Sequence, residues 1–483
     1  MKKEITYILS IVLSVMMLSC NDTETFSTNK ALRLTFSEDT VSFDTVISTI
    51  PSSTKRVLVF NNNNDGIRLT SVRLASGGES GFRINVNGSK GPVVNNLEIL
   101  KNDSIFMFVE LTTDLTNSTE PVLIRDSIMF MLESGVEQKL ILEAHGQDAI
   151  ILHAPVCKKG EVMTLTGDKP YLIYDSLVVD SNATLNIEAG ATLMLHSGAS
   201  ILVHGMLNIN GEEGKMVTIR GDRTDRMFTY LPYDRIDAQW GGIRLYGSSK
   251  GNTIRYADIH GGNYGIICDS TGVDYSKLDI HNSIITNVCG HGLQAVSCKI
   301  NVFNSIISNA RQDCVNVTGG EYNFIHCTIA QFYAIGALSD GNALRLSNVK
   351  DLDPYDLSFH VDNSIVTGFA SDEIFANRFN GNNEKSKDEV LFDLVFHNCL
   401  VTTDTIGAGR YFEDCIIDDV KGDINRKKHF KRIDTHDFLF DYHLDSLSTA
   451  RAKATSDYIR ILPKDMLGTE RKNGNVDIGA LQN

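Results

Sequence analysis

The chain has 483 residues, of which 42% are apolar and 22% are charged. This balance is typical of a globular protein and excludes a disordered or collagen-like chain. The 45 basic and 60 acidic residues give a formal net charge of −15. Because affinity for a phosphate backbone depends on clustered Lys and Arg, this charge argues against a nucleic-acid partner.

The N-terminus has the features of an export signal. Two lysines precede an apolar run over residues 5–18, and a small residue, Ser19, stands directly before Cys20. The run is short for a membrane span, so residues 1–19 are predicted to be a cleaved signal peptide. The end of this segment resembles the bacterial lipoprotein signal, which implies that Cys20 is lipidated and becomes the new N-terminus. The alternative is an ordinary signal peptide that is cut near a cysteine.

Lipidation implies an anchored protein outside the cytoplasm. We therefore expect residues 20–30 to form a polar tether from a lipid anchor in the outer membrane, on its periplasmic or its cell-surface side.

Residues 31–148 show short alternating runs that are separated by turn residues. An example is 56–60, which is followed by the turn-forming stretch 61–66, and similar runs lie at 82–86, 104–110 and 139–143. This spacing predicts an antiparallel sandwich of about seven strands. In its pattern the segment resembles the immunoglobulin-like modules of bacterial surface proteins.

From residue 150 to residue 483 the chain consists of short strands joined by glycine, with a repeated four-residue unit. The unit occurs as Asn282-Ser283-Ile284-Ile285, Asn304-Ser305-Ile306-Ile307, His326-Cys327-Thr328-Ile329, Asn363-Ser364-Ile365-Val366, Asn398-Cys399-Leu400-Val401 and Asp414-Cys415-Ile416-Ile417. Two successive copies return after 22 residues, which suits a coil of three short strands wound repeatedly. Like residues would then stack about 4.8 Å apart. The small second position is predicted to face inward, and the first position is predicted to form a stacked amide ladder.

This layout resembles the right-handed parallel β-helix repeat family over roughly residues 160–483. The segments 240–245 and 254–259 are similar to the middle coils of bacterial surface β-helices, and the chain from about residue 430 is similar to their closing segment. With the leader and the sandwich, the chain resembles Bacteroidetes-type surface lipoproteins. The expected fold is all-β, a right-handed parallel β-helix preceded by an immunoglobulin-like sandwich.

Eight cysteines remain when Cys20 is set aside. Those in the repeat share a position with serine, so we interpret them as small buried residues, and a Cys289–Cys298 disulfide is an open alternative. No cysteine pair has zinc-finger spacing. The aspartates at 351, 353 and 356 are candidates for binding calcium but are better explained as a turn. The basic run 426–432 is interpreted as a solvated face.

One column of residues is a candidate for chemistry. Gly290-His291-Gly292 resembles an element of pectin-hydrolysing β-helix enzymes, although their paired aspartates and Arg-x-Lys are missing here. Alignment on the repeat places Tyr264, His291 and Asp313 on three successive coils, with Arg311 close by. Tyr264 or His291 could act as the base of a polysaccharide lyase, supported by Arg311 or Asp313, with calcium as the one candidate cofactor. The alternative is a set of exposed turn residues.

Three functions remain in competition. We favour an anchored, monomeric surface protein whose β-helix binds a polysaccharide or cell-surface glycan, or displays itself to one, without catalysis. The second is a polysaccharide lyase or glycoside hydrolase acting on an acidic polysaccharide. The third is a purely structural or adhesive protein. Fold alone does not choose among them.

Overall fold

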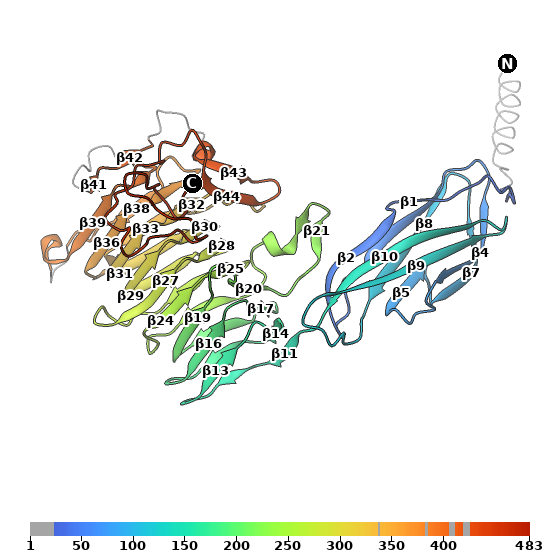
Figure 1. Cartoon of the computed structure of the whole chain (residues 1–483), viewed down its shortest axis with the longest axis horizontal. Coiled ribbons are helices and arrows are strands. Elements are labelled where there is room, and N and C mark those ends of the chain that lie inside the picture. The colour runs from blue at the N-terminus through green and yellow to red at the C-terminus, as the bar shows by residue number, and fades with distance from the viewer. Residues whose placement is uncertain (1–23, 337–338, 382–384, 405–410, 419–425) are drawn as a thin grey trace, which may run out of the picture. The chain divides into compact units, whose positions relative to one another are not determined.

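The computed structural model describes residues 24–336, 339–381, 385–404, 411–418 and 426–483. The chain divides into two compact units, residues 1–148 and 149–483 (Figure 1). The predicted signal peptide and Cys20 lie outside the described residues. Within the described ranges, no helix combines the length and the apolar character that crossing a membrane requires.

The first unit is a sandwich of two five-stranded sheets. One sheet has the order β1 (Thr35–Phe36), β3 (Lys55–Asn61), β8 (Asp103–Leu111), β5 (Phe82–Val86) and β6 (Ser89–Lys90). The other has the order β2 (Thr40–Ile47), β10 (Glu137–Gln147), β9 (Val122–Leu132), β4 (Ile67–Leu74) and β7 (Val93–Ile99). Alternate residues of these strands are buried between the sheets, as the sequence pattern predicts.

Two details of the sandwich differ from expectation. It has ten strands rather than about seven, because two-residue edge strands carry too little alternation to be found in the sequence. In addition, β2 pairs with β10 in parallel, with a bulge at Ala144 and His145, so the sandwich is not wholly antiparallel. The immunoglobulin-like class itself is confirmed.

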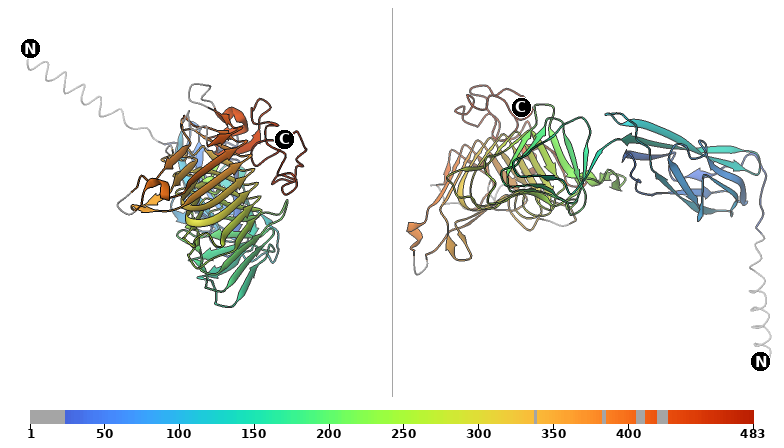
Figure 2. Two further views of the ribbon diagram at one scale, coloured as in Figure 1. Left: turned by 90° about the vertical axis from the view of Figure 1, so that its left-hand side faces the viewer. Right: turned by 90° about the horizontal axis from the view of Figure 1, so that it is seen from below.

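The second unit is a right-handed parallel β-helix, as expected. Its eleven-stranded sheet contains β11 (Ile150–His153), β14 (Tyr171–Tyr174), β17 (Thr192–Leu195), β20 (Val217–Gly221), β25 (Ala257–His260), β28 (Ile284–Val288), β30 (Ile306–Ala310), β32 (Thr328–Gln331), β37 (Ile365–Gly368), β40 (Leu400–Val401) and β42 (Ile416–Ile417). Figure 2 shows these strands stacked as successive rungs.

The seventeen-stranded sheet supplies the other two strands of each coil. It contains β12 (Val156–Cys157), β13 (Val162–Leu165), β15 (Leu177–Val179), β16 (Thr184–Glu188), β18 (Ser200–Val203), β19 (Met206–Asn210), β23 (Gly242–Leu245), β24 (Asn252–Arg255), β26 (Ile266–Cys268), β27 (Ser276–His281), β29 (Leu293–Phe303), β31 (Val315–Ile325), β33 (Leu344–Ser347), β36 (Leu357–Asp362), β38 (Ile374–Asn377), β39 (Phe392–His397) and β41 (Phe412–Glu413). In β29 and β31 the two strands of a coil run together.

Three antiparallel hairpins or pairs and three short 3-10 helices lie outside the coils. The pairs are β21 (Arg226–Phe228) with β22 (Leu231–Pro232), β34 (Val349–Lys350) with β35 (Asp353–Pro354), and β43 (Phe430–Asp434) with β44 (Leu439–Leu444). The 3-10 helices among the described residues are η1 (Tyr233–Arg235), η2 (Lys387–Glu389) and η3 (Arg426–His429).

The repeat has the register that the sequence predicts. Its third positions pair from coil to coil in the order Asp258, Ile284, Ile306, Thr328, Ile365, Leu400 and Ile416. Ser283 and Ser305 are neighbours, since the Ser283 backbone N–H donates to Ser305 Oγ at 3.1 Å. Side chains one coil apart therefore lie over one another.

The small second position has a hydrogen-bonding role as well as an inward one. The hydroxyl of Ser305 donates to the carbonyl of Phe303 at 2.7 Å, and it accepts the N–H of the coil before. The thiol of Cys399 donates in the same way to the carbonyl of His397. Serine and cysteine are interchangeable here because both are small and both can satisfy the carbonyl at the turn.

The first position does not form the expected amide ladder. Its residues have a left-handed backbone, with φ of 51° at Asn282, 49° at Asn304 and 50° at Asn363, a conformation that asparagine tolerates well. The amides of Asn304 and Asn363 donate to carbonyls of the C-terminal segment, and the Asn363 amide also lies 3.1 Å from Nε2 of His326, the first position of the preceding coil. Amide ladders occur at other positions, for example from Asn208 to Asn186 at 3.0 Å.

The C-terminal segment from residue 430 covers part of the outer face of the eleven-stranded sheet, over strands β28 to β42 (Figure 1). A separate apolar cluster fills the contact, with Ile306 and Ile365 from the sheet and Tyr442, Met466 and Ile478 from the segment. The repeat is therefore apolar at its third position, which faces outward, as well as at its fourth. The sequence analysis did not predict that both faces of these strands are buried.

The basic run 426–432 is only partly a solvated face, which corrects the expectation. Arg426 and His429 are buried, and both lie beside the carboxylate of Asp418, at 3.7 and 3.4 Å. The eight cysteines from Cys157 onward are free thiols in the structure, so the Cys289–Cys298 disulfide is not formed there. Cys298 is fully buried and directs its thiol to backbone carbonyls.

Candidate functional site

The predicted column of Tyr264, His291 and Asp313 lies at the turns that connect the eleven-stranded sheet to the seventeen-stranded sheet. Because Ile266 pairs with Leu293 and Leu293 with Val315, the residues two positions earlier, Tyr264, His291 and Asp313, are also in register. Gly290 is needed for packing, since a Cβ atom there would lie 2.4 Å from the Tyr264 ring. This close approach explains the first glycine of the Gly-His-Gly element without any chemistry.

His291 and Asp313 are in direct contact. His291 Nδ1 lies 3.2 Å from Asp313 Oδ2, and the Asn316 amide lies 3.1 Å from His291 Nε2. The Asn316 amide also donates to Asp313 Oδ2 at 3.1 Å, which fixes its nitrogen toward both partners. The backbone N–H of Asp313 also donates to His291 Nδ1 at 3.2 Å. Both ring nitrogens are therefore engaged within the protein.

The carboxylate of Asp313 is saturated with hydrogen bonds. Besides His291 and Asn316, it accepts from Arg345 Nε at 2.8 Å and from the Asn342 backbone at 3.0 Å. Its side chain is only 2% exposed. Burial alone would raise the pKa of Asp313, but the hydrogen bonds from His291, Arg345 and Asn342 outweigh it and hold the pKa below its usual value. Asp313 is thus a charged, buried anchor for its neighbours.

The most accessible member of this group is Arg345, which the sequence did not single out. Its guanidinium lies over the ring of Phe375, 4.4 Å from the centroid, while its Nε is held by Asp313. Arg345 belongs to a column of residues that are in register on successive strands of the seventeen-stranded sheet: Gln294, Asn316, Arg345 and Phe375. They form a polar and aromatic strip, called here the Arg345 strip. The Arg345 strip can be recognised only from the register of the coils and from the cation–π contact between Arg345 and Phe375.

Arg311 points to a different set of partners. Its Nε lies 3.3 Å from Asp340 Oδ2, and this charge, with a hydrogen bond to Cys289, raises the pKa of Arg311. Nearby, the Tyr333 hydroxyl donates to Asp237 Oδ2 at 2.8 Å. Burial raises the pKa of Asp237. The sequence did not indicate Asp237 or Tyr333, because they come from distant coils and match no spacing.

A second charged cluster is centred on His260. Its Nδ1 lies 2.8 Å from Asp258 and its Nε2 lies 3.0 Å from Asp234, so both nitrogens donate and the ring is an imidazolium. Burial alone would lower the pKa of His260, but the two carboxylates raise it to about 9. The cluster borders a groove of about 410 Å³ between the eleven-stranded sheet and the β43–β44 pair.

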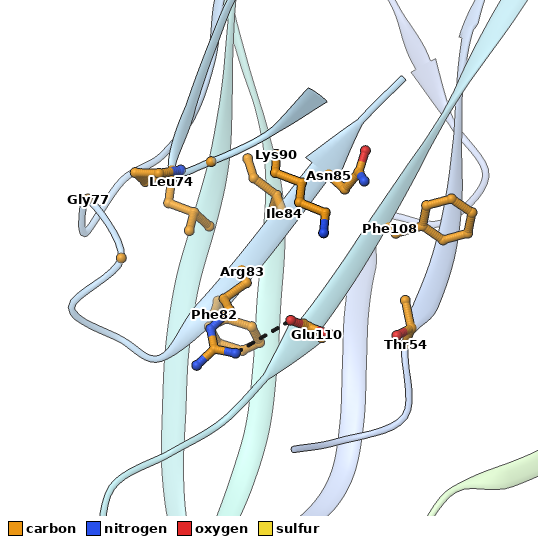
Figure 3. A pocket seen from close by; sticks show the side chains of 13 residues that line it. Thr54, Leu74, Gly77, Phe82, Arg83, Ile84, Asn85, Lys90, Phe108 and Glu110 are labelled. Carbon is orange, nitrogen blue, oxygen red and sulfur yellow. Dashed lines mark ion pairs between the residues drawn. The ribbon is translucent and has the colours of Figure 1, made fainter. Parts of the chain in front are cut away.

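The sandwich has a cavity of its own, of about 550 Å³, beside strand β5 (Figure 3). Leu74, Phe82 and Ile84 give it an apolar wall, and Arg83 pairs with Glu110 across 3.6 Å at its rim. No pattern in the sequence indicated this cavity.

The described residues contain no group of three or more His, Cys, Asp or Glu placed to hold a metal ion. The calcium expected for the lyase alternative stays a prediction. The aspartates at 351 and 353 belong to the β34–β35 pair and its turn, and Asp356 accepts the N–H of Leu391 at 2.8 Å. These contacts agree with the turn interpretation.

No protein-family model matches the chain, and no curated protein matches it. Among solved structures, the chain has a partial similarity to a family 123 glycoside hydrolase from Clostridium perfringens, from a study of glycolipid glycan hydrolysis. The two share 12% identity with a TM-score of 0.17, over 24% of this chain and 26% of that one. A similarity this small indicates neither fold nor activity.

Proposed function

We propose that this protein is an exported lipoprotein, anchored through Cys20 to the outer membrane, whose β-helix binds an acidic glycan as a monomer and without catalysis. The binding surface is the Arg345 strip. The exported location is supported by the charged start, the apolar run and the Ser19-Cys20 pair of the sequence. The two alternatives are a lyase or hydrolase and a purely structural protein.

One observation carries the non-catalytic function: the Asp313 carboxylate is buried and accepts hydrogen bonds from Asn316, Asn342 and Arg345, with His291 Nδ1 3.2 Å away. A catalytic acid or base must reach the substrate and exchange a proton with it. Asp313 does neither, and His291 has both nitrogens engaged by Asp313 and Asn316. These contacts restrain the side chains of His291, Asp313, Asn316 and Arg345.

The member that it holds toward solvent is Arg345. A guanidinium has five donors, and its planar fork matches a carboxylate such as that of a uronic acid. Because Asp313 and the Phe375 ring already restrict the side chain, little rotamer entropy is lost when a ligand binds. In the same strip, Gln294 offers its amide group and Asn316 its amide oxygen to sugar hydroxyls.

The test compares affinity for a uronate-rich polysaccharide with affinity for a neutral one, measured by titration calorimetry. We expect Arg345→Gln to lose about tenfold in affinity for the acidic glycan, since a charge-assisted hydrogen bond contributes roughly 1.5–3 kcal/mol. Arg244→Gln is the matched control, because Arg244 lies in the same register column and has a similar ion pair, with Asp269, but stands two coils before the Arg345 strip begins at Gln294. Equal loss in both variants, or no binding by the wild type, would contradict the proposal.

The anchor has a separate test. In a bacterial host, Cys20→Ala should abolish incorporation of labelled fatty acid and release the protein from the membrane fraction. Protease treatment of intact cells then distinguishes the cell-surface side from the periplasmic side. Incorporation of fatty acid that persists in the variant would contradict lipidation at this residue.

A second candidate function, a polysaccharide lyase or hydrolase, is favoured by one observation. Asp237 has a raised pKa and is hydrogen-bonded to Tyr333, with Arg311 close enough to affect its charge. A protonatable acid beside a fixed cation is a recurrent arrangement in catalytic sites. Formation of unsaturated uronate products, lost in Asp237→Asn, would favour this function over simple binding. A broad glycan array with no signal would favour the structural alternative.

A further inference from the structure

Two thiols stack at the end of the β-helix. Cys399 and Cys415 both occupy the small second position of the repeat, on consecutive coils. The pairs on either side of them fix this register: Leu400 with Ile416 in one sheet and His397 with Glu413 in the other. The backbone N–H of Ile416 also donates to the carbonyl of Cys399 at 2.7 Å.

The geometry brings the two sulfur atoms to the same side. Each thiol donates to the carbonyl two residues before it, Cys399 to His397 and Cys415 to Glu413, both at 3.3 Å. Side chains at equivalent positions of adjacent parallel strands have Cα atoms about 4.8 Å apart. Disulfides span Cα separations of roughly 4.4–6.8 Å, and in-register stacking places this pair within that range.

The other cysteine of the same column lacks such a neighbour. Cys327 lies between Ser305 and Ser364, and its backbone N–H donates to Ser364 Oγ at 2.8 Å. It is therefore a natural control for a thiol in the same position with no partner thiol. Cys399 is fully buried, whereas Cys415 is partly accessible at the end of the stack.

We propose that Cys399 and Cys415 form a disulfide bond when the protein meets a thiol–disulfide oxidant, and that this bond fastens the last coil to the β-helix. The oxidant is of the disulfide-exchange class, a dithiol oxidoreductase or oxidised glutathione. Such oxidants act on exported proteins, and exported chains commonly carry structural disulfides.

The reaction follows from which sulfur is accessible. The Cys415 thiolate attacks the disulfide of the oxidant, which releases one thiol and leaves a mixed disulfide on Cys415. The Cys399 thiolate then attacks the Cys415 sulfur, forms the new S–S bond and releases the second thiol. Two protons and two electrons pass to the oxidant, so the balance closes. A hydrogen bond with Cys399 lowers the pKa of the Cys415 thiol, which favours Cys415 as the first nucleophile.

The test uses the full chain, treated in the folded state with oxidised glutathione, then denatured and alkylated. Intact mass should show two fewer alkylated thiols than in the reduced sample, and peptide mapping should show a peptide that joins Cys399 to Cys415. The same link should survive in Cys327→Ser and should be absent from Cys415→Ser, in which Cys399 becomes alkylated.

Three outcomes would overturn the proposed disulfide. Full alkylation of the folded wild type after oxidation would overturn the proposal, as would a link between any other pair of cysteines. A link that also forms when the chain is oxidised in urea, at a yield no lower than in the folded state, would show that stacking does not select the pair, and this too would overturn it.

Discussion

Asn363 joins the turn of one coil to the C-terminal segment, and its replacement separates two contributions to stability. Its backbone has a φ of 50°, and its amide exchanges two hydrogen bonds with the Thr455 backbone, both at 2.9 Å. Asn363→Ala removes the hydrogen bonds and places a Cβ in the left-handed region. Asn363→Gly removes the same hydrogen bonds but relieves the backbone conformation.

The two contributions have known sizes. A left-handed conformation costs an ordinary residue about 1–2 kcal/mol. Each lost hydrogen bond costs about 1 kcal/mol, and more where it leaves a buried partner unsatisfied. The Asn363 amide also contacts His326 Nε2 at 3.1 Å, so each variant loses three hydrogen bonds. We therefore expect Asn363→Ala to lower the free energy of unfolding by about 4–5 kcal/mol and Asn363→Gly by about 3 kcal/mol. Asn398→Ala is the matched control: Asn398 has a φ of 51°, but its amide bonds to the His397 side chain and not to the C-terminal segment, so about 2–3 kcal/mol is expected.

The assay uses the single tryptophan of the chain. Trp240 is fully buried in the β-helix, and the sandwich contains no tryptophan, so its fluorescence in a urea titration reports on the second unit alone. If Asn363→Gly is as destabilising as Asn363→Ala, the left-handed turn contributes nothing. If Asn363→Ala is no worse than Asn398→Ala, the contact with the C-terminal segment contributes nothing. Either result would refute the reasoning.

Three further predictions concern the same unit. Because the pKa of His260 is raised from 6.5 to about 9 by Asp258 and Asp234, its stabilisation is complete below pH 6.5 and is lost as the pH rises through 9. We expect a decrease of about 3 kcal/mol across that window in urea titrations, and His260→Gln should abolish it. Ile365→Ala should cost about 2–4 kcal/mol and expose the C-terminal segment to limited proteolysis; uncut protein would contradict this. Ser305→Ala should cost about 1–3 kcal/mol and Ser305→Cys less, as thermal unfolding can check.

The fold was largely predictable because a stacked coil records its geometry in the sequence. Ser283 and Ser305 stand 22 residues apart, and the structure places them in hydrogen-bonding contact. Such a repeat can be detected in the sequence because each coil contacts mainly the next coil, so the contacting residues are separated by one repeat length. The prediction of an amide ladder at the first position of the repeat was wrong. Asparagine is common both in stacked ladders and in left-handed turns, and the sequence alone does not distinguish the two.

The candidate site was less predictable, because its partners come from separate coils. The register brought His291 to Asp313 as the sequence suggested, but Arg345 and Asn342 arrive from a coil whose length departs from the repeat. The covering of Ile306 by the C-terminal segment also depends on residues far away in the chain. Such contacts leave no spacing to detect, although the outward-facing isoleucines were a signal that could have been used.

The most direct test of the account is a distance measured along the stack. Arg244 and Phe375 are both exposed and lie in one register column, five coils apart through Ile267, Gln294, Asn316 and Arg345. Spin labels on cysteines at 244 and 375, with Cys289 and Cys415 replaced by serine, should give a single narrow distance near 24 Å, at about 4.8 Å per coil. A distance beyond about 35 Å, or a broad distribution, would contradict in-register stacking of the coils.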